Sequence, residues 1–217
     1  MSKLLYKEFK LARHATMFFF PLFGLMLLIP NYPYTVAFFY TCLEIFFIFL
    51  TGRENKDVMF TALLPVEKRD VVRARTLMIV ILQLLNLAVS IPFAFIGRDI
   101  NPQPGGNGAG IEANAAYYAI VLIAFALYNF IFLTKFYKTG YSAGAAFAWS
   151  CAAVGVWLLG AEISVQVIPA LKSQLDAWDA SSRPLRLAIL AGAVVIYAAA
   201  TLLASARAQK EFERVDL

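Results

Sequence analysis

Six blocks of mostly apolar residues, separated by short polar or charged segments, constrain this chain more than any other feature. A bilayer core is about 30 Å thick, and a helix needs roughly 20 apolar residues to cross it. In a chain of 217 residues, six such spans leave too little for a second folded domain. The predicted spans are 16–30, 35–51, 77–97, 115–134, 143–161 and 185–206. We therefore expect an all-α integral membrane protein with a single transmembrane domain, residues 1–217.

Composition agrees with this expectation. Hydrophobic residues make up 61% of the chain and charged residues 15%, whereas soluble domains are roughly half apolar and a quarter charged. The first two blocks are short, so they would cross with little tilt or in a locally thinned bilayer.

The distribution of positive charge predicts the topology. Fifteen of the nineteen Lys and Arg residues lie in the N-terminal segment, the 52–77 and 135–142 loops and the C-terminal segment. The positive-inside rule therefore places both termini in the cytoplasm, which requires an even number of spans and agrees with six. Because the basic residues follow this alternation, the net charge of +5 does not indicate a nucleic-acid partner.

The N-terminal segment, residues 1–14, is amphipathic at helical spacing. One face holds Leu5, Phe9 and Ala12, and the other holds Lys3, Lys7, Lys10 and His14. A basic helix of this kind lies in the membrane interface, with its lysines at the lipid headgroups. The alternative is an ordinary basic extension of the first span. No small-x-small cleavage site follows it, so we expect the segment to be retained rather than removed as a signal peptide.

Glu44 is the acidic residue in the middle of a predicted span, where it should face the bundle or a wet cavity rather than lipid. Its possible partners are Gln83, Asn86 and Ser90 on one face of the third span, and Asn129 in the fourth. Two interpretations remain open: a polar lining of a substrate path, or a buried structural hydrogen-bond network.

An intramembrane enzyme would need paired catalytic groups at matching depth, and one buried glutamate with one terminal histidine does not supply them. Cys42 and Cys151 fall in apolar spans, without metal-type Cys/His spacing. We therefore expect no catalytic residues and no metal site.

Two outer segments are predicted from charge. Residues 98–115 are rich in Gly, Pro and Asn but lack the GxxxxGK[ST] phosphate-binding pattern, which favours a flexible external linker. In residues 162–184, apolar residues recur at helical spacing around Pro169, which predicts short helices dipping into the outer interface, with Trp178 as an anchor. A plain loop is the alternative there.

The fifth span begins with a stripe of small residues, Gly140, Gly144 and Ala148. Such a stripe lets helix backbones approach closely in lipid. Whether the packing partner belongs to the same chain or to another is left open by the pattern.

The 52–77 loop is the longest charged interval of the chain. Asn55 is a favoured helix cap, and Pro65 excludes a continuing helix, so we expect a short helix, a break and a second helix from near Glu67. The short helix would expose Lys56, Asp57, Met59, Phe60 and Leu63.

This loop resembles a pattern found after the second span of small ABC-2 type transporter permeases, including bacteriocin-immunity and cytolytic-peptide exporters. The resemblance rests on Glu54-Asn55-Lys56-Asp57, on Leu63-Leu64-Pro65-Val66, and on Lys68-Arg69-Asp70-Val71-Val72 with Arg75. One departure is Glu67, where the family often has a small or hydroxyl residue, as suits a helix cap.

The resemblance implies a permease of a bacterial cytoplasmic-membrane exporter for a peptide or other amphipathic cargo. Two copies of a separate ATPase subunit would bind ATP and Mg²⁺, and this chain would bind no cofactor. Coupling to the ATPase would use Asn55, Lys56, Asp57, Met59, Phe60 and Leu63. A second permease copy or paralogue would pack through the first and fifth spans, which gives the Gly140 and Gly144 stripe a role. The alternative function is a membrane scaffold or sensor that holds a cytoplasmic protein through the same loop.

Overall fold

The computed structural model describes residues 2–11, 16–62, 65–101, 107–139 and 142–215, and these residues form helices without a strand. Five helices are long and apolar enough to cross a membrane. They are α3 (Thr35–Glu54), α5 (Lys68–Ile100), α6 (Ala115–Thr139), α7 (Ala143–Val167) and α9 (Arg183–Glu213). The prediction of an all-helical, multi-pass membrane protein is confirmed.

The first predicted span has a different form. It consists of α2 (Thr16–Phe19) and a 3₁₀ helix, η1 (Phe20–Leu28). A 3₁₀ helix rises about 2.0 Å per residue against 1.5 Å for an α-helix, so the segment extends about 24 Å. That length is short of a bilayer core of roughly 30 Å. A sixth crossing by this segment therefore stays a prediction.

The 3₁₀ helix η1 packs closely against α5. Gly24 lies against Ser90, and a Cβ atom on Gly97 would lie 2.5 Å from the carbonyl oxygen of Leu27. The absence of side chains at these glycines lets the two backbones approach, as small residues do between membrane helices.

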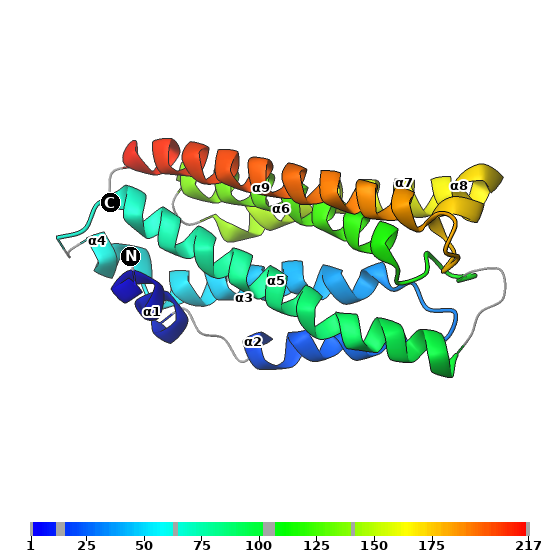
Figure 1. The fold of residues 1–217 in the computed structure, drawn as a ribbon. Helices are drawn as coiled ribbons and strands as arrows, with labels where there is room; N and C mark the ends of the chain where they lie inside the picture. Colours follow the sequence, from blue (N-terminus) through cyan, green and yellow to red (C-terminus); the bar gives the residue numbers. More distant parts are fainter. Residues whose placement is uncertain (1, 12–15, 63–64, 102–106, 140–141, 216–217) are drawn as a thin grey trace.

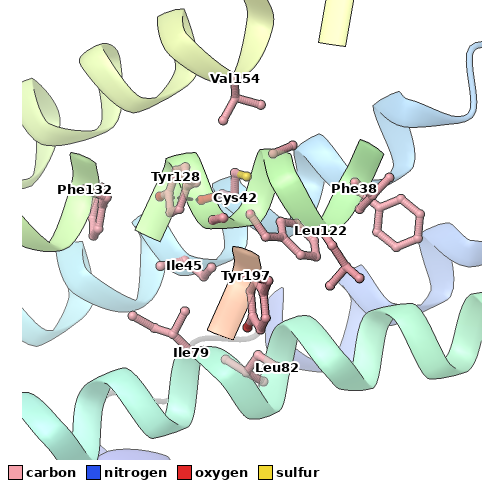
Figure 2. Close-up of a cluster of buried hydrophobic side chains, with 14 of the residues drawn as sticks. Phe38, Cys42, Ile45, Ile79, Leu82, Leu122, Tyr128, Phe132, Val154 and Tyr197 are labelled. Atoms are coloured by element: carbon pink, nitrogen blue, oxygen red, sulfur yellow. Dashed lines mark hydrogen bonds between the residues drawn. The ribbon is translucent and has the colours of Figure 1, made fainter. Parts of the chain in front are cut away.

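Helix α6 is the most enclosed of the five and packs against α7 and α9, with α3 beside it. Figure 2 shows Phe38, Cys42 and Ile45 of α3 facing Leu122, Tyr128 and Phe132 of α6, with Ile79 and Leu82 of α5 close by. The Tyr128 hydroxyl donates to the Cys42 carbonyl at 2.8 Å, so the buried polar tip of this ring has a partner.

Both described ends of the chain lie at one end of the bundle, together with α1 (Ser2–Leu11) and α4 (Asp57–Ala62), whereas α8 (Pro169–Leu175) lies at the opposite end (Figure 1). At the first end, Lys68 Nζ donates to the Val215 carbonyl at 2.7 Å, and Arg69 pairs with Glu213. Termini at the same end agree with an even number of crossings. Which side of the membrane they occupy stays a prediction.

The opposite end is closed by packed connections. Pro169 separates α7 from α8 because it lacks an N–H and favours the first position of a helix. Residues 162–167 continue α7, so the 162–184 segment holds one short helix. The predicted outer linker, residues 98–115, is described only in part. Its first residues continue α5 to Ile100, and residues 102–106 lie outside the described residues. Near its end, the Asn114 side chain donates to the Leu175 carbonyl at 2.6 Å.

Candidate coupling site and buried polar network

A sharp turn separates α3 from α4. Asn55 is the C-terminal cap of α3, and α4 begins two residues later at Asp57, so a cap of α4 by Asn55 stays a prediction. Lys56 between them has φ of 52°, in the left-handed region that few non-glycine residues adopt. Its carbonyl accepts from the Phe60 amide at 2.9 Å. This turn reverses the chain and lays α4 against the end of the bundle.

Arg75 of α5 lies at the centre of a buried ion-pair network. Its guanidinium donates to the carboxylates of Glu8 and Asp57. The Lys7 ammonium lies 2.8 Å from Asp57 Oδ1 and 3.0 Å from Glu8 Oε1. Arg75 and Asp57 are each 3% exposed and Glu8 is fully buried. We call Lys7, Glu8, Asp57 and Arg75 the Arg75 network. Its two positive and two negative charges balance.

Helix α3 supplies the space for the Arg75 side chain. A Cβ atom on Gly52 would lie 3.2 Å from Arg75 Nη1, so a larger residue there would crowd the guanidinium. The guanidinium also lies 5.1 Å from the centre of the Phe49 ring, in a cation–π contact. One side chain of α5 therefore contacts α1, α3 and α4.

The burial of Asp57 overturns the expectation that α4 exposes it. Burial opposes ionisation of this carboxyl, but Arg75 and Lys7 outweigh that effect and hold its pKa below the usual value of 3.8. Thr61, one turn later, is also buried and accepts from Lys7 Nζ at 2.6 Å. Phe60, by contrast, is 54% exposed. Helix α4 thus combines buried polar residues that contact the bundle with an exposed apolar residue.

For two other predicted coupling residues, the burial of the side chain is not described. Leu63 and the Met59 side chain lie outside the described residues. Lys56 is exposed, as predicted. The burial of Glu8 was not foreseen, because one acid among the lysines of α1 gives no sign in the sequence of the arginine that it meets.

The predicted polar residues in the spans form paired groups. Gln83 and Asn129 exchange two amide hydrogen bonds, each of 2.9 Å. Tyr197 of α9 donates to Gln83 at 2.8 Å, and Asn129 donates to Thr201 at 3.1 Å. All four side chains are buried. Tyr197 and Thr201 were not predicted, although their spacing of four residues places both on one face of α9.

Glu44 belongs to a second group. Its Oε2 accepts from Asn86 at 3.2 Å, while its fully buried Oε1 has no hydrogen-bond partner among the described residues. Ser90 forms a third group with Tyr118, their hydroxyls 3.0 Å apart. The five predicted residues therefore do not form one continuous lining. Most of their hydrogen-bonding groups pair within the bundle, which favours a structural role in this conformation.

A cavity of about 650 Å³ opens beside the first group, between α5 and α9. Tyr197 and Thr201 line it, together with Thr76 and Ser205, and Arg73 lies at its wall. The buried network thus reaches an open space toward the end of the bundle that carries α4.

The stripe on α7 is not used for packing within the described part of the chain. Gly144 and Ala148 are exposed, and no atom lies within 4 Å of a Cβ atom built on Gly144. Gly140 lies outside the described residues. Large apolar side chains of α7, including Val156 at 76% exposure, continue this open face.

A comparison with protein families matches the chain to a known family. The model of a family described as ABC-2 family transporter protein covers residues 3–207, nearly the whole chain. No curated protein and no solved structure matches the chain. The matched region includes α1, α4 and most of α9.

Proposed function

The chain belongs to the ABC-2 transporter family, and from that premise we propose that it is the permease subunit through which a separate ATPase drives export of a peptide or other amphipathic cargo. Membership of the family supports an ATPase partner, on which ATP and Mg²⁺ would bind. The observation that carries the proposal is the arrangement of α4, which is anchored to the bundle by the buried Asp57 and exposes the apolar Phe60.

Docking would use the outward side of α4. Phe60 is a large apolar side chain at a charged end of the bundle, where a groove on the ATPase would remove it from water. The exposed Lys56 lies beside it and would add polar contacts at the rim. Asn55, Met59 and Leu63 complete the proposed docking set.

Transmission would use the inward side. A displacement of α4 would pull on Arg75 of α5 through Asp57, and on α1 through Lys7. Buried charge pairs resist separation, because each partner left alone would be an uncompensated charge in a medium of low dielectric constant. The α4 helix, α1 and the start of α5 would therefore move together.

The cargo path is proposed to begin in the cavity between α5 and α9. It combines hydroxyl groups of Thr76, Thr201 and Ser205 with apolar walls, which suits an amphipathic molecule. The basic residues near α1, α4 and the C-terminus support a cytoplasmic location for this end. Six crossings and cytoplasmic termini are part of the proposal.

A second copy or a paralogue is proposed to complete the path, with one ATPase on each copy. The exposed stripe at Gly144 and Ala148 supports this assembly, because it offers a surface on which another helix backbone can approach closely.

The experiment is co-purification from native membranes with a tag on this chain. ATPase activity should co-elute with the wild-type chain. The Phe60→Asp variant should be present in the membrane at the wild-type level, but no ATPase activity should co-elute with it. Ile100→Asp is the matched control, since Ile100 is an apolar residue, 67% exposed, at the end of α5 that lies away from α4. If Phe60→Asp retains the ATPase at the wild-type level, docking through α4 is refuted. A retained soluble partner without ATP hydrolysis would instead support the scaffold function.

A further inference from the structure

A second cavity, of about 500 Å³, lies at the opposite end of the bundle between α5 and α9. It is bounded by the connections before α6 and before α9, and it is separate from the cavity near α4. Its walls include Ile91, Phe95, Arg98, Trp178, Arg183 and Leu187. Ligand pockets in proteins commonly have about 300–1,000 Å³, so this one has room for a small headgroup and the start of a hydrocarbon chain.

The charged part of this cavity has an excess of positive charge. Arg186 is 4% exposed and is held by Asp179, whose carboxylate lies 2.9 Å from it. Arg98 and Arg183 have no ion-pair partner within the described ranges. Two arginines of the cavity are therefore left uncompensated.

Arg98 makes a cation–π contact with an aromatic ring. Its guanidinium lies 5.0 Å from the centre of the Trp178 ring, and the indole N–H donates to Glu112 at 3.3 Å. A stacked guanidinium keeps its edge free for bidentate hydrogen bonds, which match the oxygens of a phosphate group.

The apolar part of the cavity opens toward lipid. Ile91, Phe95 and Leu187 line it and are 43%, 52% and 49% exposed. On helices that cross a membrane, exposed apolar side chains face hydrocarbon. The cavity therefore joins a positive end to an apolar side that a membrane lipid can enter.

We propose that this cavity binds the headgroup of an anionic glycerophospholipid, with the phosphate at Arg98 and Arg183 and an acyl chain along Ile91 and Leu187. Basic pockets between membrane helices are known to suit anionic headgroups. A lipid with a net negative charge is favoured over a zwitterionic one, because the ammonium of the latter would meet the same two arginines. The inference needs only that α5 and α9 cross a membrane, and it does not depend on the proposed transport function.

Trp178 provides the reporter for the test. A variant carrying Trp149→Phe and Trp157→Phe leaves it as the single tryptophan of the chain, which has three. The protein is placed in phosphatidylcholine nanodiscs that contain a minor fraction of brominated lipid. Brominated phosphatidylglycerol should quench Trp178 at a lower fraction than brominated phosphatidylcholine. Removing each arginine, as Arg98→Gln and Arg183→Gln, should weaken this preference by about fivefold.

Lys172→Gln is the matched control, because Lys172 is a cation at the same end that bonds to Gln166 at 2.9 Å and does not line the cavity. It should keep the preference. Equal quenching by the two lipids, or a preference that survives the loss of both arginines, would overturn the proposal. Displacement of the lipid by millimolar inorganic phosphate would also overturn it, since the site would then recognise a free anion.

A second measurement tests the same proposal without the tryptophan substitutions, in case these substitutions impair folding. Native mass spectrometry of the otherwise unmodified chain should find phosphatidylglycerol retained by the wild type and lost from the double arginine variant. Thermal melting of both in the same detergent checks that the arginine changes leave the bundle folded. Retention of the lipid by a folded double variant would contradict the assignment.

Discussion

Arg75 of α5 donates to the Asp57 carboxylate of α4 at the point where Gly52 of α3 leaves room for the guanidinium. The same guanidinium donates to Glu8 of α1. The short helix after α3 is therefore not a loose surface element. It is tied to the longest helix of the bundle by a buried ion pair, and this connection gives a physical route from the proposed ATPase partner to the spans.

Replacing Arg75 by methionine should strongly destabilise this end of the bundle. It would leave Glu8 and Asp57 buried without their arginine, a loss that typically costs about 3–5 kcal/mol. Thermal melting in detergent measures the effect. Arg73→Met is the control, because the Arg73–Asp70 pair is largely exposed and such pairs contribute at most about 1 kcal/mol. Similar melting temperatures for the two variants would contradict the central place of Arg75.

Neutralising Glu8 and Asp57 together with Arg75 should restore much of that loss. The variant Glu8→Gln, Asp57→Asn, Arg75→Met carries no unpaired buried acid, and buried ion pairs are often replaced by neutral residues at little cost. Its melting temperature should exceed that of Arg75→Met alone. If it melts lower, uncompensated charge is not the source of the destabilisation.

The stability contributed by Asp57 should depend on pH in one direction. Because its pKa in the folded protein is lowered, the contribution is present above the usual value of 3.8 and is lost as the pH falls through the lower, folded value. The stability difference between wild type and Asp57→Asn should therefore be constant from pH 5 to 8 and shrink in stronger acid. Chemical unfolding across this range measures it. A difference that shrinks between pH 5 and 8 would show that the carboxyl is not held in its charged form.

Replacing Gly97 and Gly144 by alanine should have different effects on the stability of the bundle. Gly97→Ala places a Cβ atom against the Leu27 carbonyl, so the backbone of η1 or α5 must shift, at a cost of about 1–3 kcal/mol. The Cβ atom added by Gly144→Ala would contact no other atom, so this substitution should be neutral or stabilise the helix by up to about 1 kcal/mol. Melting of the detergent-solubilised monomer separates them. Equal effects would mean that η1 does not pack on α5 as described.

The Gln83–Asn129 pair should show coupling. Gln83→Leu leaves the Asn129 side-chain oxygen and the Tyr197 hydroxyl without their Gln83 partner and should cost about 1–2 kcal/mol, whereas Gln83→Leu with Asn129→Leu should recover part of the loss. A double-mutant cycle of unfolding free energies gives the coupling. Additive losses would indicate that the pair is not formed in the membrane.

Much of the helical framework was predictable from the sequence. Long apolar runs with short polar connections specify membrane helices, and Pro65 and Pro169 mark breaks that the structure has. The prediction that a helix resumes near Glu67 is confirmed, with α5 starting at Lys68 and Glu67 contributing no side-chain cap. The 3₁₀ form of η1 was not predictable, because hydropathy does not distinguish a 3₁₀ helix from an α-helix.

The candidate site was predicted less well, for a physical reason. Helical spacing places Lys56, Asp57 and Phe60 on a short helix but does not say which side meets the bundle. Asp57 is buried because Arg75, eighteen residues later, lies beneath it. Such a long-range pairing of charges leaves no periodic signal in one sequence. The same is true of Tyr197 of α9, which hydrogen-bonds to the predicted residue Gln83 but was not itself predicted.

The most direct test of the account follows an ATP-driven change from the ATPase to the far end of the bundle. The complex is reconstituted in proteoliposomes, with Cys151→Ser and an Ile100→Cys label site, and reaction with a membrane-impermeant maleimide is timed with and without ATP. ATP should change the labelling rate in this background and in the exposed control Asp70→Asn. In Asp57→Asn the ATPase should stay bound, because Phe60 is intact, but the ATP-dependent change should be lost. An unaltered ATP-dependent change in Asp57→Asn would contradict transmission through the Arg75–Asp57 pair.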